Sequence, residues 1–324
     1  MTYDEFLNDV REDINKLLGD EVCVKTHRIL KNNDIELDAL TIITKDSNVS
    51  PTIYLNSYYD EYLRGKEIDE ITKEICDLYI SNSTKINFDV DIFKSFENIR
   101  DKVVFKLINT KANKKLLRDI PHIDFLDLSI VFYCMFDNEY LGSATALIHN
   151  IHVNMWEITV EELYEIAKEN TPKLLKYEIK EMNELIRDIL VGDIKKVICE
   201  NDDRYDKNCE TANPEVVADE LMKDLMKAKE QISMYVLTNR QRMNGAACLL
   251  YDHIIEDFAK EMQKDLYILP SSIHEVILIP AINGMSREEL TEMVKEVNKD
   301  EVDDIDVLSD HTYYFSREEG KIII

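Results

Sequence analysis

The stretch from Leu266 to Pro280 constrains the fold most strongly, because two apolar runs flank a short polar turn. Both runs are rich in β-branched residues and are punctuated by proline, which is typical of β-strands. The turn contains Ser271, Ser272, His274 and Glu275. A hydroxyl, an imidazole and a carboxylate are therefore expected close together, beside two buried strands.

The patterns along the rest of the chain predict an α+β fold. Apolar residues three and four positions apart predict helices over residues 3–18, 68–79, 88–99, 159–170, 177–191, 214–233, 245–263 and 287–298. Apolar and β-branched runs predict further strands over residues 22–30, 35–44, 51–55, 103–108, 126–136, 143–153, 234–238, 312–315 and 321–324. We expect mixed, largely antiparallel sheets packed against these helices.

Two of these segments have a more specific interpretation. The asparagines and aspartate at residues 32–34 tolerate the positive φ of a tight turn, which predicts an antiparallel hairpin from the first two strands. The almost wholly apolar run at 126–136 predicts a central strand that is covered on both faces. The tyrosines at 58, 59 and 62 have helical spacing and are interpreted as core residues.

The length of 324 residues favours two domains. Residues 192–214 are polar, acidic and without hydrophobic period, which is typical of a linker or a long loop. We therefore predict an N-terminal α/β subdomain at 1–191 and a C-terminal α/β subdomain at 215–324, joined by this acidic segment.

Two internal similarities suggest that the subdomains are related strand–helix units. The segments 158–169 and 285–296 each carry a capping box, formed by Thr159 with Glu162 and by Ser286 with Glu289. The segments 142–148 and 245–251 also resemble each other, although their offset along the chain differs from that of the first pair.

The chain carries 39 basic and 65 acidic residues, which gives a net charge of −26 at pH 7. This charge repels nucleic-acid phosphates and anionic lipids, so we expect no direct binding to nucleic acid or to a membrane. The remaining interpretations are a solubilising surface, an acidic surface that meets a protein partner, or an acidic inhibitor that mimics DNA.

The cysteines at 23, 76, 134, 199, 209 and 248 form no C-x-x-C motif, and three of them stand among apolar residues. That pattern is typical of the reducing cytoplasm. The acidic opening Met1-Thr-Tyr-Asp-Glu5 does not resemble a signal peptide, and no run approaches the length of a membrane span. We expect a cytoplasmic protein.

Ser271 or Ser272, His274 and Asp310 supply the residue types of a nucleophile, a base and an orienting carboxylate. A nucleophilic serine usually stands on a glycine-rich elbow, and glycine is scarce around this turn. The alternative interpretation is a turn whose hydroxyls bind backbone groups, with His274 as a structural histidine.

Two other clusters contain residues with catalytic or metal-binding chemistry. His149 and His152 would lie on opposite faces of a strand, which disfavours a shared metal ion. His122, Asp124 and Asp127 precede a buried strand, where aspartate usually orders the loop through backbone hydrogen bonds. No nucleotide-binding motif is present, and we expect no metal and no cofactor.

Five short motifs, spread in order along the chain, resemble an uncharacterised family of low-GC Firmicutes proteins, a domain of unknown function. The motifs are Pro51–Leu55 with Tyr58, Tyr59 and Tyr62, then Pro121–Asp127, Tyr235–Asn239 with Gly245–Ala247, Leu269–Glu275 and Leu308–Asp310. The resemblance covers nearly the whole chain and implies a bacterial cytoplasmic setting. It implies no activity and no catalytic residues.

Taken together, these patterns favour a non-enzymatic binding or regulatory module whose acidic surface contacts a protein partner. The alternative is a hydrolase-like enzyme that uses Ser271 or Ser272, His274 and Asp310. A DNA-mimicking inhibitor is a third possibility, and it requires carboxylates in two rows on one face.

Overall fold

A computed structural model describes the chain except for residues 20–21, 45–49, 83–89, 139–141, 201–212, 227–231 and 283–285. The described residues divide into two compact units. Unit 1 comprises Met1–Asp124 and Ser129–Asn170, and unit 2 comprises Phe125–Leu128 and Thr171–Ile324. This division differs from the predicted one at 192–214. Residues 192–200 of that segment belong to a helix, and residues 201–212 lie outside the described part of the chain.

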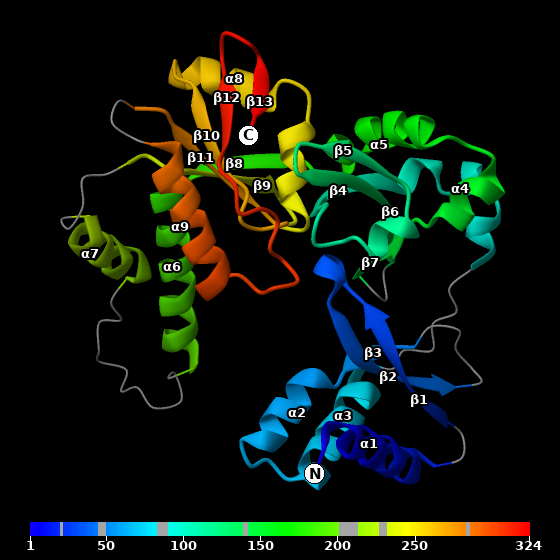
Figure 1. Ribbon diagram of the computed structural model, residues 1–324. Helices are drawn as coiled ribbons and strands as arrows, with labels where there is room; N and C mark the ends of the chain where they lie inside the picture. Colours follow the sequence, from blue (N-terminus) through cyan, green and yellow to red (C-terminus); the bar gives the residue numbers. More distant parts are fainter. Residues whose placement is uncertain are drawn as a thin grey trace. The chain divides into compact units, whose positions relative to one another are not determined.

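The first part of unit 1 is a three-stranded antiparallel sheet with helices (Figure 1). Its elements are α1 (Tyr3–Leu18), β1 (Val22–Leu30), β2 (Glu36–Thr44), β3 (Thr52–Tyr54), α2 (Asn56–Leu63) and α3 (Ile68–Asn82). The predicted hairpin is confirmed, because β1 pairs with β2 in antiparallel register from Val22 opposite Thr44 to Leu30 opposite Glu36. Strand β3 continues the sheet beside β2.

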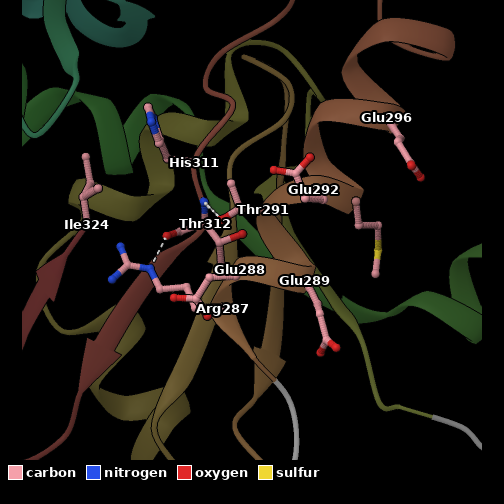
Figure 2. A pocket seen from close by; sticks show the side chains of 10 residues that line it. Arg287, Glu288, Glu289, Thr291, Glu292, Glu296, His311, Thr312 and Ile324 are labelled. Atoms are coloured by element: carbon pink, nitrogen blue, oxygen red, sulfur yellow. Dashed lines mark hydrogen bonds between the residues drawn. The ribbon is translucent and has the colours of Figure 1, made fainter.

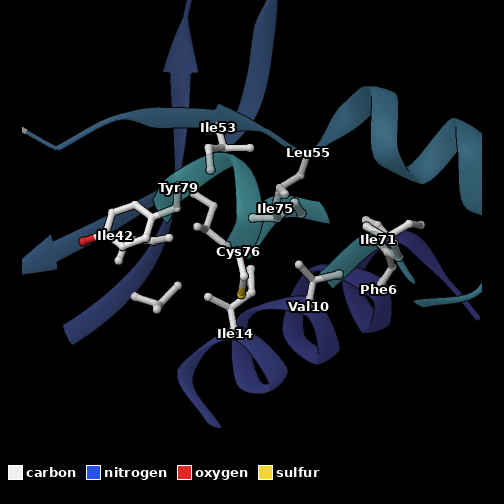
Figure 3. Close-up of a cluster of buried hydrophobic side chains, with 12 residues drawn as sticks. Phe6, Val10, Ile14, Ile42, Ile53, Leu55, Ile71, Ile75, Cys76 and Tyr79 are labelled. Atoms are coloured by element: carbon white, nitrogen blue, oxygen red, sulfur yellow. The ribbon is translucent and has the colours of Figure 1, made fainter. Parts of the chain in front are cut away.

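One apolar cluster holds this part together (Figure 3). Phe6, Val10 and Ile14 recur on one face of α1 and are fully buried against Ile71 and Ile75 of α3. A capping box starts α1, with Thr2 and Glu5 each bonding the other's backbone N–H. The tyrosines of α2 pack against the same cluster, which confirms their interpretation as core residues.

A second sheet follows in the order β4-β6-β5, with β7 also paired to β6. The elements of this region are three 3-10 turns (Val90–Lys94, Phe96–Asn98 and Arg100–Lys102), β4 (Val103–Asn109), a further turn (Leu116–Arg118), β5 (His122–Phe125), β6 (Leu128–Asn138), β7 (Gly142–Leu147), α4 (Asn150–Trp156) and α5 (Val160–Leu174). The central strand is confirmed, because every residue from Leu128 to Phe136 is buried.

Unit 2 contains a six-stranded antiparallel sheet in the order β13-β12-β10-β11-β9-β8. Its elements are β8 (Tyr177–Glu181), α6 (Met182–Glu200), α7 (Pro214–Met226), β9 (Tyr235–Asn239), the 3-10 helix η7 (Gly245–Leu250), α8 (Ile254–Met262), β10 (Leu266–Leu269), β11 (Val276–Pro280), α9 (Arg287–Asp300), β12 (Tyr313–Ser316) and β13 (Lys321–Ile323). The two strands predicted around the polar turn are confirmed as β10 and β11.

Helices cover both faces of this sheet (Figure 1). Leu290 and Val294 of α9 pack against Leu269 and Ile279 on one face. Side chains alternate between faces along a strand, so Tyr235, whose ring contacts Phe258 of α8, lies on the other face. None of the described helices is long and apolar enough to cross a membrane.

Three element predictions in the middle of the chain are wrong. The expected strand at 143–153 ends at Leu147, and α4 begins at Asn150. The expected helix at 177–191 begins as strand β8, because its residues pair with β9, and α6 then runs through Gly192. Helix α5 continues past Pro172 to Leu174, so the proline stands in its last turn, where it supplies no backbone N–H.

Three further expectations are wrong. The expected helix at 245–263 is the 3-10 helix η7 followed by α8, with His253 between them in the left-handed region at φ +68°. The segment at 88–99 forms 3-10 turns rather than an α-helix where it is described. The similarity between segments 142–148 and 245–251 is not structural, because one contains β7 and the other η7.

Candidate functional site

Asp127 belongs to unit 2 and stands on a tight turn. The turn joins β5 to β6 through Leu126 and Asp127, and Leu126 adopts a positive φ of 57°. A bulky side chain rarely adopts this conformation, and such strain is concentrated at functional sites. The turn therefore presents Asp127 at a cost in backbone energy.

The carboxylate of Asp127 collects side-chain hydrogen bonds from the segment 309–313. Ser309 Oγ donates to Oδ2 at 2.7 Å, His311 Nδ1 donates to the same oxygen at 3.1 Å, and the Tyr313 hydroxyl donates to Oδ1. We call these four residues the Asp127 cluster. Because Nδ1 faces a carboxylate, it carries the proton, and Nε2 of His311 is the basic nitrogen of the neutral ring.

The turn that follows β10 holds the segment that carries Ser309, His311 and Tyr313, through backbone hydrogen bonds. The backbone N–H of Ser309 donates to the carbonyl of Pro270, and that of Leu308 donates to the carbonyl of Ser271, both at 2.9 Å. Tyr313 is fully buried, and burial raises the pKa of its hydroxyl, with Asp127 raising it further. Tyr313 is therefore a permanent hydrogen-bond donor to the carboxylate.

His311 and Asp127 are arranged like the base and the orienting carboxylate of a catalytic triad, because the carboxylate fixes the orientation of the imidazole ring. Ser309, however, donates to Asp127 and accepts the backbone N–H of His311 at 3.0 Å. Its hydroxyl is therefore used by the cluster itself and is not activated by the imidazole.

His311 also lines a groove of about 760 Å³ in unit 2 (Figure 2). The other lining residues are Arg287, Glu288, Glu289, Thr291, Glu292, Met293, Glu296, Thr312 and Ile324. We call this the α9 groove. Arg287 is held within it, because its Nε donates to the carbonyl of Thr312 at 2.9 Å.

Acidic residues dominate the α9 groove. Glu288, Glu292 and Glu296 are four residues apart, so they form one row along a face of the helix. Glu292 pairs with Lys295 at 2.7 Å, while Glu288 and Glu296 have no partner among the described residues. Thr312 is fully buried and lines the groove, and its Oγ1 has no hydrogen-bond partner within the described part of the chain.

The residues predicted for a hydrolase lie in unit 2 but have separate partners. Asp310 accepts a hydrogen bond from the amide of Asn298 at 2.9 Å. Ser272 Oγ accepts the backbone N–H of His274 at 3.0 Å, which is the turn interaction of the alternative interpretation. The backbone carbonyl of Ser271 holds the segment that carries the Asp127 cluster.

Both ring nitrogens of His274 are engaged. Nδ1 accepts the backbone N–H of Asn244 at 3.3 Å, and Nε2 faces Asp306 at 3.4 Å. These contacts give His274 a carboxylate partner, but it is Asp306 where Asp310 was expected. A catalytic role for the predicted residues stays a prediction that a turnover assay must test.

His149 and His152 lie at the start of helix α4, contrary to the expectation that they stand on a strand. His152 Nδ1 accepts the backbone N–H of His149 at 3.0 Å, and the His149 ring pairs with Asp119 at 2.7 Å. His152 also stacks on Trp156 with ring centroids 5.4 Å apart. Within the described residues, no group of three or more His, Cys, Asp or Glu side chains is arranged to hold a metal ion.

A family model described as "Family of unknown function (DUF5688)" matches residues 3–317. The chain belongs to this family. Comparison with curated proteins and with solved structures gives no match. The resemblance noted from the sequence motifs is thus confirmed at the level of a domain of unknown function.

In this DUF5688 member, the motif segments at 121–127, 269–275 and 308–310 meet at the Asp127 cluster. Sequence reasoning interpreted Asp127 only as a loop-ordering residue and did not connect it with His311 or Tyr313. The available signal was the co-occurrence of these motifs in one chain, because each is too short to specify a site alone.

Proposed function

We propose that the protein is a binding module and that the α9 groove receives a basic, extended segment of a partner protein. The observation that supports this most directly is the row of Glu288, Glu292 and Glu296 in a groove of about 760 Å³. The proposal includes a setting in the reducing cytoplasm of a bacterium, where the buried thiols of Cys76, Cys134 and Cys248 remain free.

The spacing of the row favours an extended partner. Residues four apart on a helix are separated by about 6 Å along its axis. Alternate side chains of an extended strand are about 6.6 Å apart, so lysines or arginines at every second position match the glutamates in turn. Met293, which is 44% exposed, and Ile324, which is 46% exposed, supply apolar contact for the intervening residues.

The exposed ion pair in the groove does not oppose this binding. Glu292 and Lys295 are largely solvent-exposed, and pairs of that kind contribute about 0–1 kcal/mol. A guanidinium or ammonium of the partner therefore displaces Lys295 at little cost. His311, whose ring is held by Asp127, supplies a polar contact at the same surface.

The alternatives have less support. In the hydrolase interpretation His274 should be available as a base, yet its two ring nitrogens already face Asn244 and Asp306. The DNA-mimic interpretation requires two rows of carboxylates on one face, and α9 supplies a single row.

The test is a fluorescence anisotropy titration with a labelled peptide of alternating lysine and valine, beside the same peptide with glutamate replacing lysine. Glu288→Gln, Glu292→Gln and Glu296→Gln are combined in one variant of the full chain. The matched control neutralises three exposed acids of unit 1, Asp9→Asn, Glu12→Gln and Asp77→Asn. We expect the groove variant to bind the basic peptide about tenfold more weakly, while the control binds as the wild type does.

Equal losses in the two variants would show that the peptide senses only net charge, which contradicts the proposal. For the natural partner, a photo-reactive amino acid at Met293 is cross-linked inside the native host, and the attached peptide is sequenced. A segment with basic residues at alternate positions, lost in the groove variant, supports the proposal. A segment without basic residues overturns it.

A further inference from the structure

A second pocket in unit 2, of about 280 Å³, lies on the sheet face that α9 also covers. It is lined by Glu178, Lys180, Met182, Leu185, Val236, Thr238, Arg242, Glu275 and Ile277. We call it the Arg242 pocket. Its volume is near the lower end of the range for ligand sites, about 300–1,000 Å³, so it fits a ligand of few atoms.

The floor of the Arg242 pocket is apolar. Val236 of β9 pairs with Ile277 of β11, and the two side chains lie on the same face of the sheet. Met182 and Leu185, from the first turn of α6, add a wall beside them. A ligand that enters this pocket therefore gains by burying an aliphatic or aromatic side chain.

The charges around this floor are balanced, although the chain as a whole carries a net charge of −26. Glu178 and Glu275 oppose Lys180 and Arg242, which gives two negative and two positive groups. Lys180 lies 3.5 Å from Glu178 and 3.5 Å from Asp188. Arg242 and Glu275, by contrast, have no side-chain hydrogen bond or ion pair among the described residues.

Arg242 is presented by a strained and braced loop. Its φ is +52°, a left-handed conformation that costs a residue with a side chain about 1–2 kcal/mol. The buried side chain of Asn239 fixes the loop, accepting from the N–H groups of Gln241 and Met243 and donating to the carbonyl of Met243. A strained backbone conformation of this kind persists only where the surrounding contacts hold it in place.

The polar turn after β10 braces the same loop and places Glu275. The backbone N–H of Asn244 donates to the ring of His274, and Thr238 Oγ1 donates to the carbonyl of His274 at 2.8 Å. Glu275 follows directly in the chain. The two unpaired charges of the pocket, Arg242 and Glu275, are thus carried by two segments that are bonded to each other.

We infer that the Arg242 pocket binds a free α-amino acid with an apolar side chain, its carboxylate paired with Arg242 and its ammonium with Glu275. The side chain lies on Val236 and Ile277. A simple anion would meet two glutamates in the pocket, and a simple cation would meet Arg242 and Lys180. The zwitterion is the class whose charges match both, and it requires no counter-ion.

The experiment is isothermal titration calorimetry of the full chain with leucine, isoleucine, valine, methionine and phenylalanine. Two analogues of leucine each lack one charge: 4-methylpentanoate has no ammonium group and 3-methylbutylamine has no carboxylate. We expect at least one amino acid to bind, and both analogues to bind at least about tenfold more weakly, because each loses a charge-assisted hydrogen bond.

Variants locate the site. Arg242→Asn removes the guanidinium and keeps a residue that tolerates positive φ, while Glu275→Gln removes the other charge. Arg240→Gln is the matched control, because Arg240 is exposed in the same loop and does not line the pocket. We expect each pocket variant to weaken binding about tenfold or more, and the control to bind normally.

Absence of heat for every amino acid at millimolar concentration overturns the inference, as does binding that neither pocket variant reduces. Tighter binding of 4-methylpentanoate than of leucine assigns the pocket to carboxylates and also overturns it. These outcomes are independent of the α9 groove, since the groove variant keeps the Arg242 pocket intact and is titrated in parallel.

Discussion

The carboxylate of Asp127 accepts a hydrogen bond from the hydroxyl of Tyr313, a residue 186 positions later in the chain. Burial raises the pKa of Tyr313, and the negative charge of Asp127 raises it further. The hydroxyl therefore keeps its proton throughout the physiological range and remains a donor.

We predict that Asp127 and Tyr313 contribute jointly to stability. A double-mutant cycle with Asp127→Asn and Tyr313→Phe should give a coupling free energy of about 1–3 kcal/mol in urea unfolding at neutral pH, because the bond involves a charged acceptor. Tyr314 bonds a different carboxylate, that of Asp265 at 2.6 Å, so Tyr314→Phe is the control. Coupling of Asp127 to Tyr314 as large as to Tyr313 would contradict the assignment.

A second prediction concerns His152. Burial lowers the pKa of its imidazole, and the neighbouring His149 lowers it further. In the unfolded chain the pKa of the ring is about 6.5. Between the lowered pKa and that value the unfolded state binds more protons than the folded state, so the free energy of unfolding rises with pH across this window. The stabilisation is present above the unfolded pKa and is lost as pH falls through the folded pKa.

Two measurements check this. His152→Gln keeps a side chain that reaches the N-cap N–H but does not titrate, so urea unfolding should lose part of its pH dependence between about pH 5 and pH 7. Trp156 is the single tryptophan and stacks on His152, so its emission in the folded protein should fall as the ring is protonated. His27→Gln, at an exposed position of β1, is the control for the fluorescence measurement and should leave the tryptophan emission curve unchanged.

The third prediction compares two glycines. A Cβ at Gly245 would stand 2.2 Å from Thr238 Oγ1 and 2.3 Å from the carbonyl oxygen of His274, so Gly245→Ala forces apart the braced loop of the Arg242 pocket. We expect a loss of about 1–3 kcal/mol in thermal or urea unfolding. A Cβ at Gly192, inside α6, would meet nothing within 4 Å, so Gly192→Ala should stabilise by about 0.5–1 kcal/mol. Equal effects at the two positions would be inconsistent with these contacts.

The fourth prediction concerns thiol reactivity. Burial raises the pKa of Cys134 and of Cys248 to about 12, whereas Cys23 is exposed. Because the thiolate is the reactive form, iodoacetamide at about pH 8 should modify Cys23 before these two in the folded protein. Peptide mass spectrometry follows each site, and the denatured chain, in which all rates should converge, is the control. Rapid alkylation of Cys248 under native conditions would show that its segment opens readily.

Elements specified by neighbouring residues were predictable from the sequence. The hairpin of β1 and β2, the strands around the polar turn and the capping box at Ser286 depend on residues close in the chain, and all are present. Strand β8 was not predictable, because its short apolar pattern also fits a helix. Its conformation is decided by pairing with β9, far along the sequence.

The same distinction applies to the candidate site. The chemistry of Ser272 and His274 was visible in the sequence, and so was the alternative of a structural turn, which the bond from the His274 N–H to Ser272 favours. The convergence of Asp127 with His311 was not visible, because a turn after β5 meets a segment before β12 only in the folded chain. Arg242 carries no sequence signal, since its role depends on a left-handed backbone and an unpaired side chain.

The assignment of Phe125–Leu128 to unit 2 means that this unit is discontinuous in the sequence. No single cut yields it whole: a fragment starting at Thr171 retains Ser309, His311 and Tyr313 but not the carboxylate that they share. During synthesis the carboxylate of Asp127 leaves the ribosome before Ser309, His311 and Tyr313, so these hydrogen bonds form only after the end of the chain has been made. Attempts to dissect or permute the chain should therefore carry the β5–β6 turn along with the second unit.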